Sequence, residues 1–157
     1  KASKGKGLPI GNLTSQFFAN LYLNELDHFA KRELKCHWYV RYMDDLVILS
    51  ESKCQLEQWM GEIETFLRER LDLVLHPTKR IINPITNGID FVGYVIRPFY
   101  ILVRKRVIGN LRGKIWTRQI NRQVWTSYKG HFKHAQAHRL KLGLQDMLIE
   151  HGYDWVL

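Results

Sequence analysis

Apolar residues recur at helical spacing over residues 14–34 and again over residues 53–71. In both segments they follow the 3.6-residue period, which predicts an amphipathic helix with one broad face packed inward. Asn12, Thr14 or Ser15 can cap the first of these helices. The inward positions are Leu13, Phe17, Phe18, Leu21, Tyr22, Leu26 and Phe29 in the first helix, and Leu56, Trp59, Met60, Ile63, Phe66 and Leu67 in the second.

Two short runs rich in Val, Ile, Leu and Tyr lie between these helices, at residues 39–42 and 46–49. Their composition predicts two β-strands. The connection consists of Met43, Asp44 and Asp45, without the Gly, Pro or Asn of an ordinary loop. We therefore expect a stiff hairpin that carries both aspartates at its turn.

Further strands are expected after the second helix. Residues 73–75 and 101–103 are short apolar runs, and residues 90–96 form a longer one that contains Gly93, where a backbone can approach closely. Asn87-Gly88 is the strongest hairpin-turn signal in the chain. The pattern thus predicts a second set of strands that completes a sheet.

Two more helices are expected at residues 105–124 and 131–150, although Gly109 and Gly113 weaken the first. Both segments again place apolar residues on one side. Their inward positions are Val107, Ile108, Leu111, Ile115, Ile120 and Val124, then Phe132, Ala135, Leu140, Leu144, Met147 and Leu148.

These elements predict an α+β fold with a charge boundary in it. A flexible start at residues 1–6 precedes a domain at residues 7–98, where an antiparallel sheet packs on two helices, and a helical domain at residues 99–157. Residues 1–96 hold 12 Lys+Arg and 12 Asp+Glu, whereas residues 97–157 hold 12 Lys+Arg and 3 Asp+Glu, so the net charge of +9 lies in the second part. This asymmetry is expected of a nucleic-acid clamp; a merely soluble basic surface is the alternative.

Other classes of protein are disfavoured by the composition. No run of about 18 apolar residues could span a membrane, and the Lys-rich start lacks the apolar segment of a signal peptide. Cys36 and Cys54 have no companion Cys or His at metal-ligand spacing. They fit a reducing cytosol, so we expect a cytoplasmic protein.

Asp44 and Asp45 are candidate metal ligands. Two like charges side by side repel each other, and an oxygen-preferring divalent cation such as Mg²⁺ relieves that repulsion. Ordinary turn chemistry is the alternative for an isolated Asp pair. His131, His134 and His138 also have a spacing that metal sites use, but no carboxylate or Cys accompanies them, so backbone contacts or solvent exposure are expected instead.

The segment Gly7-Leu8-Pro9-Ile10-Gly11-Asn12-Leu13-Thr14-Ser15-Gln16 is a second candidate site. A Gly-bearing loop that enters a helix N-terminus presents free N–H groups and the positive end of the helix dipole. Both suit a phosphate or an incoming nucleotide. An ordinary turn before a helix is the alternative.

Several of these motifs resemble those of reverse transcriptases. Tyr42-Met43-Asp44-Asp45 between two apolar strands resembles the polymerase signature, and residues 125–135 resemble the thumb signature of bacterial retroelement enzymes. The loop at residues 7–16 resembles the nucleotide-contacting loop in the form typical of diversity-generating retroelements. Retroviral, retron and group II intron enzymes usually carry Pro-Gln-Gly where this chain has Pro9-Ile10-Gly11. An enzyme of retron or group II intron type, or a non-catalytic RNA-binding relative, is the alternative.

The resemblance implies a partial palm at residues 7–98 and a thumb at residues 99–157. It implies roles for particular residues: Asp44 and Asp45 in catalysis and Mg²⁺ binding, and Lys79 as a catalytic general acid. It places Ile10, Gly11, Gln16 and Tyr42 at the incoming nucleotide, and Phe91, Val92, Gly93 and Tyr94 in the primer grip. It places Arg104, Lys105, Arg106, Lys129, Lys133, Arg139 and Lys141 on the template–primer backbone.

The resemblance also implies the reaction and its partners. The intact enzyme would copy template RNA into cDNA from a primer and dNTPs by two-metal nucleotidyl transfer. A further Asp of the family comes from a strand that would precede Lys1, so we interpret the chain as a fragment that is inactive alone. An accessory protein is a possible partner. We also expect that the fragment can dimerise through its exposed palm surface.

Overall fold

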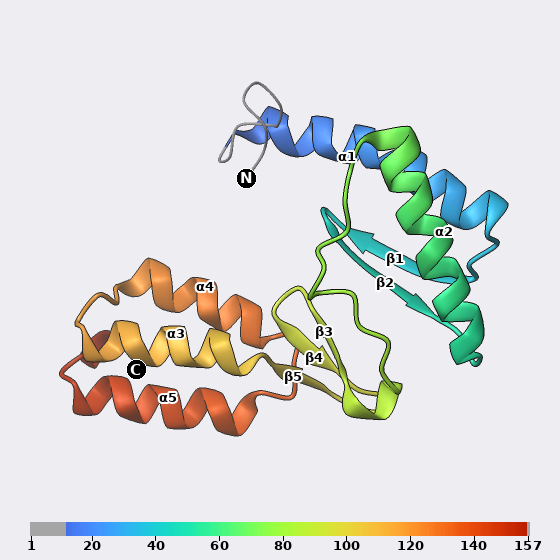
Figure 1. Cartoon of the computed structure of the whole chain (residues 1–157). Coiled ribbons are helices and arrows are strands. Elements are labelled where there is room, and N and C mark those ends of the chain that lie inside the picture. Colours follow the sequence, from blue (N-terminus) through green and yellow to red (C-terminus); the bar gives the residue numbers. More distant parts are fainter. Residues whose placement is uncertain (1–11, 157) are drawn as a thin grey trace. The chain divides into compact units, whose positions relative to one another are not determined.

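The computed structural model describes residues 12–156, which contain small antiparallel sheets and five α-helices (Figure 1). The fold is therefore mixed α+β, as the sequence predicts. The chain divides into two compact units, Lys1–Ile82 and Asn83–Leu157. This division assigns residues 83–98, which the sequence groups with the palm, to the compact unit of the C-terminal helices.

The first unit places a two-stranded antiparallel hairpin beside two helices (Figure 1). The first helix runs directly into a short π-helical segment, so the pair covers almost the whole predicted segment 14–34. The elements are α1 (Leu13–His28), the π-helix η1 (Phe29–Glu33), β1 (Trp38–Tyr42), β2 (Asp45–Leu49) and α2 (Lys53–Leu71).

Local capping sets the ends of these helices. The hydroxyl of Ser52 accepts a hydrogen bond from the backbone N–H of Gln55 at 3.3 Å, which begins α2. Asp72 then adopts the left-handed conformation with φ of 48° and ends it. The expected bounds of α2, residues 53–71, are thus confirmed. Asn12 occupies the N-cap position of α1 but its side chain makes no capping hydrogen bond.

The core of the first unit is formed by α2 and the C-terminal half of α1. Leu26, Ile63, Leu67 and Leu71 are buried, and β2 contributes partly buried residues to the same cluster. The rings of Phe29 and Phe66 are stacked, with centroids 4.2 Å apart and planes 12° from parallel. The inward face predicted for α2 is therefore confirmed.

The inward face predicted for α1 is wrong over its N-terminal half. Phe17, Phe18, Leu21 and Tyr22 are 64%, 53%, 59% and 50% exposed. In the described part of this unit, α2 and one small hairpin supply the apolar surface, and the buried cluster reaches only the later turns of α1. Helical periodicity identifies an apolar face, but it does not say how much of that face another element covers.

The second unit begins with a three-stranded antiparallel sheet in the order β3-β4-β5 and continues into three helices (Figure 1). A short 3₁₀ turn lies at each end of the unit. The elements are η2 (Ile85–Asn87), β3 (Ile89–Phe91), β4 (Tyr94–Ile96), β5 (Ile101–Val103), α3 (Lys105–Trp116), α4 (Arg122–Phe132), α5 (His138–Glu150) and η3 (Asp154–Val156).

Three helices replace the two expected at residues 105–124 and 131–150. The first break follows Trp116: Arg118 has a left-handed φ of 54°, and the side chain of Asn121 accepts from the N–H of Val124 at 2.9 Å to cap α4. The second break lies between Phe132 and His138. Apolar periodicity continued through both breaks because the connecting residues also face the core.

The core of this unit matches the predicted inward positions. The buried side chains come from β5, from all three helices and from the connections between them, and Val107, Ile108, Val124, Ala135, Leu140 and Met147 pack against them. Trp125, which is 2% exposed, lies outside the predicted inward positions. The buried residues are Val103, Leu111, Ile115, Ile120, Trp125, Phe132, Ala137, Leu144 and Leu148.

Three expectations about strands are wrong. The later strands do not complete one sheet with the first hairpin, because β3, β4 and β5 form a sheet of their own. Residues 73–75 form no strand in the described structure, and Val74 there is 81% exposed. Asn87-Gly88 does not form the hairpin turn, because Ile85–Asn87 is a 3₁₀ turn that leads into β3. The turn lies instead at Val92-Gly93, which splits the expected strand 90–96 into β3 and β4. The extended run at 101–103 is confirmed as β5.

Candidate functional site

The tip of the first hairpin carries the aspartate pair. Tyr42 pairs with Asp45 across β1 and β2, so Met43 and Asp44 form a two-residue loop and Asp45 is the first residue of β2. Met43 has a positive φ of 55°, whereas Asp44 does not. This φ is sterically unfavourable for a residue other than glycine, so contacts around the turn must stabilise it.

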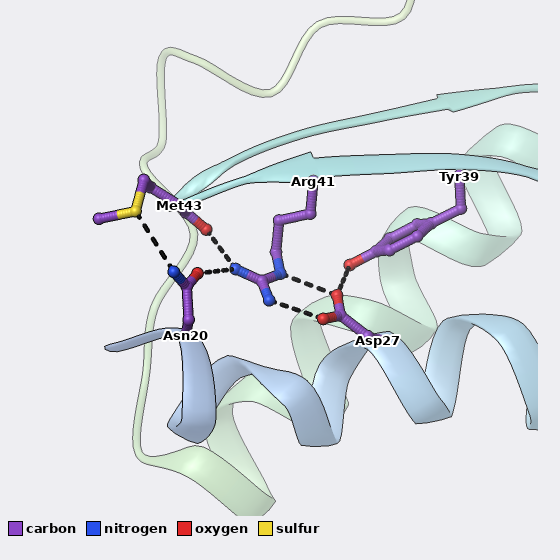
Figure 2. Close-up of polar contacts among 5 residues, drawn as sticks. All are labelled: Asn20, Asp27, Tyr39, Arg41 and Met43. Carbon is purple, nitrogen blue, oxygen red and sulfur yellow. Dashed lines mark hydrogen bonds and ion pairs between the residues drawn. The ribbon is translucent and has the colours of Figure 1, made fainter. Parts of the chain in front are cut away.

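Arg41 supplies such a contact. Its Nη1 donates a hydrogen bond to the backbone carbonyl oxygen of Met43 at 2.8 Å, as Figure 2 shows. The carbonyl belongs to the residue directly before Asp44. The guanidinium therefore holds the backbone at the point from which the first carboxylate projects.

Arg41 is itself held by Asp27 on α1. Its Nε donates to Oδ1 of Asp27 at 2.8 Å and its Nη2 donates to Oδ2 at 2.6 Å, a bidentate arrangement that restricts the guanidinium to one plane (Figure 2). The hydroxyl of Tyr39 donates to Oδ1 of the same carboxylate at 2.7 Å. The Arg41 side chain is only 10% exposed and that of Asp27 is 29% exposed.

These contacts shift the protonation equilibria of all three groups. Burial acts to raise the pKa of Asp27, but hydrogen bonds from Arg41 and Tyr39 and the positive charge of Arg41 outweigh it, so this pKa lies below its usual value. The hydrogen bond to Asp27 raises the pKa of Arg41. Burial, followed by the hydrogen bond to Asp27, raises the pKa of Tyr39 well above its usual range. The network is therefore an ion pair plus a neutral phenol at neutral pH.

Asn20 joins the same network one heptad before Asp27. Its side-chain oxygen accepts from Nη1 of Arg41 at 3.0 Å, and its amide nitrogen lies 3.6 Å from the sulfur of Met43 (Figure 2). Residues seven apart lie on the same face of a helix, which is why both reach the hairpin. Sequence reasoning assigned no role to Asn20, Asp27 or Arg41. The available signal was an Arg inside an apolar strand and polar residues at a seven-residue spacing in an apolar helix.

The two carboxylates at the tip are available to a ligand. Asp44 and Asp45 are both exposed, and neither side chain has a hydrogen bond or ion pair to another described residue. Carboxylate oxygens are the ligands that Mg²⁺ prefers. Residues 12–156 contain no group of three or more His, Cys, Asp or Glu able to hold a metal ion. The donor chemistry thus fits Mg²⁺, and the described residues contribute two carboxylates toward its coordination.

Three of the other predicted site residues lie in the part of the chain that the structure describes. Tyr42 is 58% exposed at the end of β1, and Gln16 is exposed on the first turns of α1. Lys79 is exposed in the loop after α2, where its backbone N–H donates to the carbonyl of His76 at 3.2 Å. No hydrogen bond or ion pair among the described residues joins Lys79 to the aspartates. Ile10 and Gly11, like the expected flexible start at residues 1–6, lie outside the described residues.

The predicted primer-grip residues form the β3–β4 hairpin. Phe91 pairs with Tyr94, and Val92 and Gly93 make the turn between them. All four residues are half-buried. The sequence expectation of one strand is therefore replaced by a hairpin whose tip contains the predicted residues.

The predicted backbone-contacting residues lie in three places. Arg104 precedes α3 and forms an ion pair with Asp90 of β3, whereas Lys105 and Arg106 are exposed on the first turn of that helix. Arg139 is exposed on α5. An open hollow of about 360 Å³ lies between α4 and α5, and its lining includes Lys129, Lys133, His138 and Lys141. The structure thus brings three of the seven predicted cations around one concave surface.

Two remaining features of the described residues are the apolarity of the helices and the state of the cysteines. None of the helices in residues 12–156 combines the length and apolarity needed to cross a bilayer. Cys36 is buried and Cys54 is exposed, and both are free thiols. Burial raises the pKa of Cys36, which disfavours its thiolate.

Comparison with known proteins identifies the family. Residues 2–96 match the family model described as reverse transcriptase (RNA-dependent DNA polymerase). The chain is also similar to the protein named "Putative COX1/OXI3 intron 2 protein" of Saccharomyces cerevisiae, with 24% identity over 109 residues. That alignment covers 61% of this chain and 13% of the yeast protein, so the chain corresponds to a small part of that relative. The chain thus belongs to the reverse transcriptase (RNA-dependent DNA polymerase) family.

Proposed function

We propose that this chain supplies part of the palm, at residues 7–98, and the thumb, at residues 99–157, of an RNA-directed DNA polymerase. The observation that carries the proposal is the hairpin tip, where Asp44 and Asp45 are exposed and unpaired while Arg41 holds the adjacent backbone. Unpaired like charges are unfavourable without a ligand. A ligand-binding role explains why a partly buried ion pair stabilises the backbone beneath them.

Asp44 and Asp45 are the residues that would hold Mg²⁺, together with a carboxylate from outside the described residues. Bound Mg²⁺ supplies charge stabilisation for the attacking primer 3′-hydroxyl and for the leaving pyrophosphate. In this assignment Asp44 is the principal ligand and Asp45 has a supporting role. Tyr42 and Gln16 would contact the incoming dNTP, and Lys79 would donate a proton to pyrophosphate.

The basic second unit would bind the template–primer duplex. Lys129, Lys133 and Lys141 line one hollow, which supports a shared role on a phosphate backbone. The β3–β4 hairpin would hold the primer 3′ end. A merely soluble basic surface would scatter such charges, whereas here several surround one concavity.

Primer extension on an RNA template tests the proposal, with a full-length enzyme that carries this chain, dNTPs and Mg²⁺. Asp44→Asn should abolish extension without altering thermal unfolding, because it removes the ligand charge at an exposed position. Asp146→Asn on α5 is the matched control, since it makes the same exchange at an exposed site away from the hairpin. Normal extension by the Asp44 variant would refute the assignment.

We propose the diversity-generating retroelement branch as the finer identity, on the basis of Pro9-Ile10-Gly11 and the sequence after it. Ile10 can only pack against a nucleotide, whereas a Gln there could hydrogen-bond to it, so discrimination would depend on shape alone. The resemblance to this branch implies error-prone copying with infidelity directed at adenines, so Ile10→Gln should reduce misincorporation opposite template adenines. An unchanged error spectrum would remove the support for this role of Ile10.

An intron-type reverse transcriptase is the second candidate. The similarity to a yeast protein whose name refers to an intron favours it. The two candidates differ in genetic context and in fidelity. A template-repeat and variable-repeat pair beside the gene, with adenine-directed errors in the product, would favour the first candidate. An adjoining intron and faithful copying would favour the second.

A further inference from the structure

The turn of the β3–β4 hairpin has an unfavourable backbone conformation. Val92 and Gly93 both have positive φ, 49° and 84°, which is the pattern of a type I′ turn. A β-branched residue such as Val92 rarely adopts this conformation. The turn therefore depends on contacts outside the hairpin.

His131, near the end of α4, supplies three of these contacts. Its ring is stacked on that of Tyr94, with centroids 4.2 Å apart and planes 15° from parallel. The hydroxyl of Tyr94 donates to the backbone carbonyl of His131 at 2.9 Å. The Nε2 atom of His131 lies 3.4 Å from the carbonyl oxygen of Gly93, which also accepts from the N–H of Arg104 at 2.9 Å.

The imidazole also packs tightly against the turn backbone. A Cβ atom at Gly93 would lie 3.0 Å from Cε1 and 3.2 Å from Nε2 of His131. Glycine is thus required at this position both by its φ and by the proximity of the ring. The ring fills the space that a side chain at position 93 would need.

A second set of contacts attaches the sheet to the segment between α4 and α5. The backbone N–H of Ile101 donates to the side-chain oxygen of Gln136 at 2.6 Å, and the N–H of Gln136 donates to the carbonyl of Ile101 at 2.9 Å. Ile101 pairs with Ile96, at the end of β4 away from the turn. The two attachments therefore hold both ends of β4 in place relative to the helices.

We propose that His131 is a positioning residue that joins the β3–β4 hairpin to α4, so that the turn and the neighbouring lysines keep one fixed arrangement. The inference rests on the proposed function, in which the hairpin holds the primer 3′ end and Lys129 and Lys133 bind backbone phosphates. Both lysines lie two residues from His131 along the chain. A primer held by the hairpin and a backbone held by the lysines are then placed in register by one side chain.

Three substitutions separate the two contributions of the ring. His131→Phe keeps the stacking on Tyr94 but removes the nitrogen near Gly93, His131→Gln keeps an N–H donor but removes the ring, and His131→Ala removes both. His134→Ala is the matched control. His134 is exposed one turn away, and its side chain has no hydrogen bond, ion pair or ring contact with a described residue.

Steady-state primer extension with the full-length enzyme is the first measurement. His131→Ala should raise KM for primer–template roughly tenfold while kcat and KM for dNTP change by less than about twofold. His131→Phe and His131→Gln should give smaller increases, and His134→Ala should match the wild type. A merely structural role would lower the active fraction and leave KM for primer–template unchanged.

Hydrogen exchange of the Arg104 amide in the same proteins is the second measurement. This amide donates to Gly93, so it should exchange faster in His131→Ala and at the wild-type rate in His134→Ala. Unchanged exchange, or an unchanged KM in an active His131→Ala enzyme, would overturn the inference. If the wild type itself extends no primer, the proposed function fails, and the exchange rates still decide whether His131 holds the turn.

Discussion

Replacing Asp27 by Asn should destabilise the first unit and disturb the hairpin tip. The carboxylate accepts three hydrogen bonds, two from Arg41 at 2.8 and 2.6 Å and one from Tyr39 at 2.7 Å. The amide of Asn has one acceptor oxygen and no charge. The variant therefore leaves a guanidinium that is 10% exposed without a counter-charge.

The magnitude follows from the burial of the pair. Removing one partner of a fully buried ion pair costs about 3–5 kcal/mol. Asp27 is 29% exposed, so water can solvate part of the vacated position. The remaining amide oxygen can still accept one bond. We therefore expect a loss of about 2–3 kcal/mol in the free energy of unfolding near neutral pH.

The pH dependence of the free energy of unfolding tests the contribution of Asp27 independently. The pKa of Asp27 is depressed below its usual 3.8, so its ionised form stabilises the folded state. This contribution is fully present above pH 3.8 and is lost as the pH falls through the lower folded-state pKa. The difference in the free energy of unfolding between wild type and Asp27→Asn should thus be constant near neutral pH and become smaller in acid.

Urea denaturation at a series of pH values measures both effects. Asp146→Asn serves as the control, because this exposed residue on α5 has no ion pair in the described structure. Primer extension by Asp27→Asn should also fall, since Arg41 no longer holds the Met43 carbonyl in one position. The reasoning would be refuted if Asp27→Asn lost less than about 0.5 kcal/mol in the free energy of unfolding. It would also be refuted if the stability difference from wild type stayed the same in acid.

Three further predictions concern the second unit. Leu148→Ala should lower the free energy of unfolding by about 2–5 kcal/mol, because Leu148 is fully buried in the core; a chemical denaturation curve measures this. Gly93→Ala should destabilise the hairpin through both its φ and the contact with His131, and thermal unfolding should show a lower midpoint than for Gly109→Ala, where a Cβ meets open space. Changing Lys129 and Lys133 together to Gln should reduce the slope of log affinity against log salt by about two for a template–primer duplex; an unchanged slope would exclude phosphate contacts by this pair.

The sequence by itself determined α2, the first hairpin and the family. The periodic apolar run at residues 53–71 predicted α2 at its observed bounds, and the apolar strands around the aspartates predicted the first hairpin. These features depend on neighbours within a few residues, so a linear pattern contains them. The polymerase signature is equally local, and the family match over residues 2–96 agrees with it.

Only the tertiary structure decided where the last three helices break and which residues form the second hairpin turn. The left-handed conformation at Val92 is unfavourable for a β-branched residue, and the long-range contacts of His131 with Gly93 and Tyr94 stabilise that turn. The left-handed conformation at Arg118 belongs instead to a helix C-cap, in which the N–H of Gln119 donates to the carbonyl of Lys114 at 2.8 Å. The ion pair between Arg41 and Asp27 joins residues 14 apart on different elements. The contact between His131 and Gly93 spans 38 residues. Spacing along the chain does not encode such pairs, because their partners meet only after α1 and α4 have packed against their hairpins.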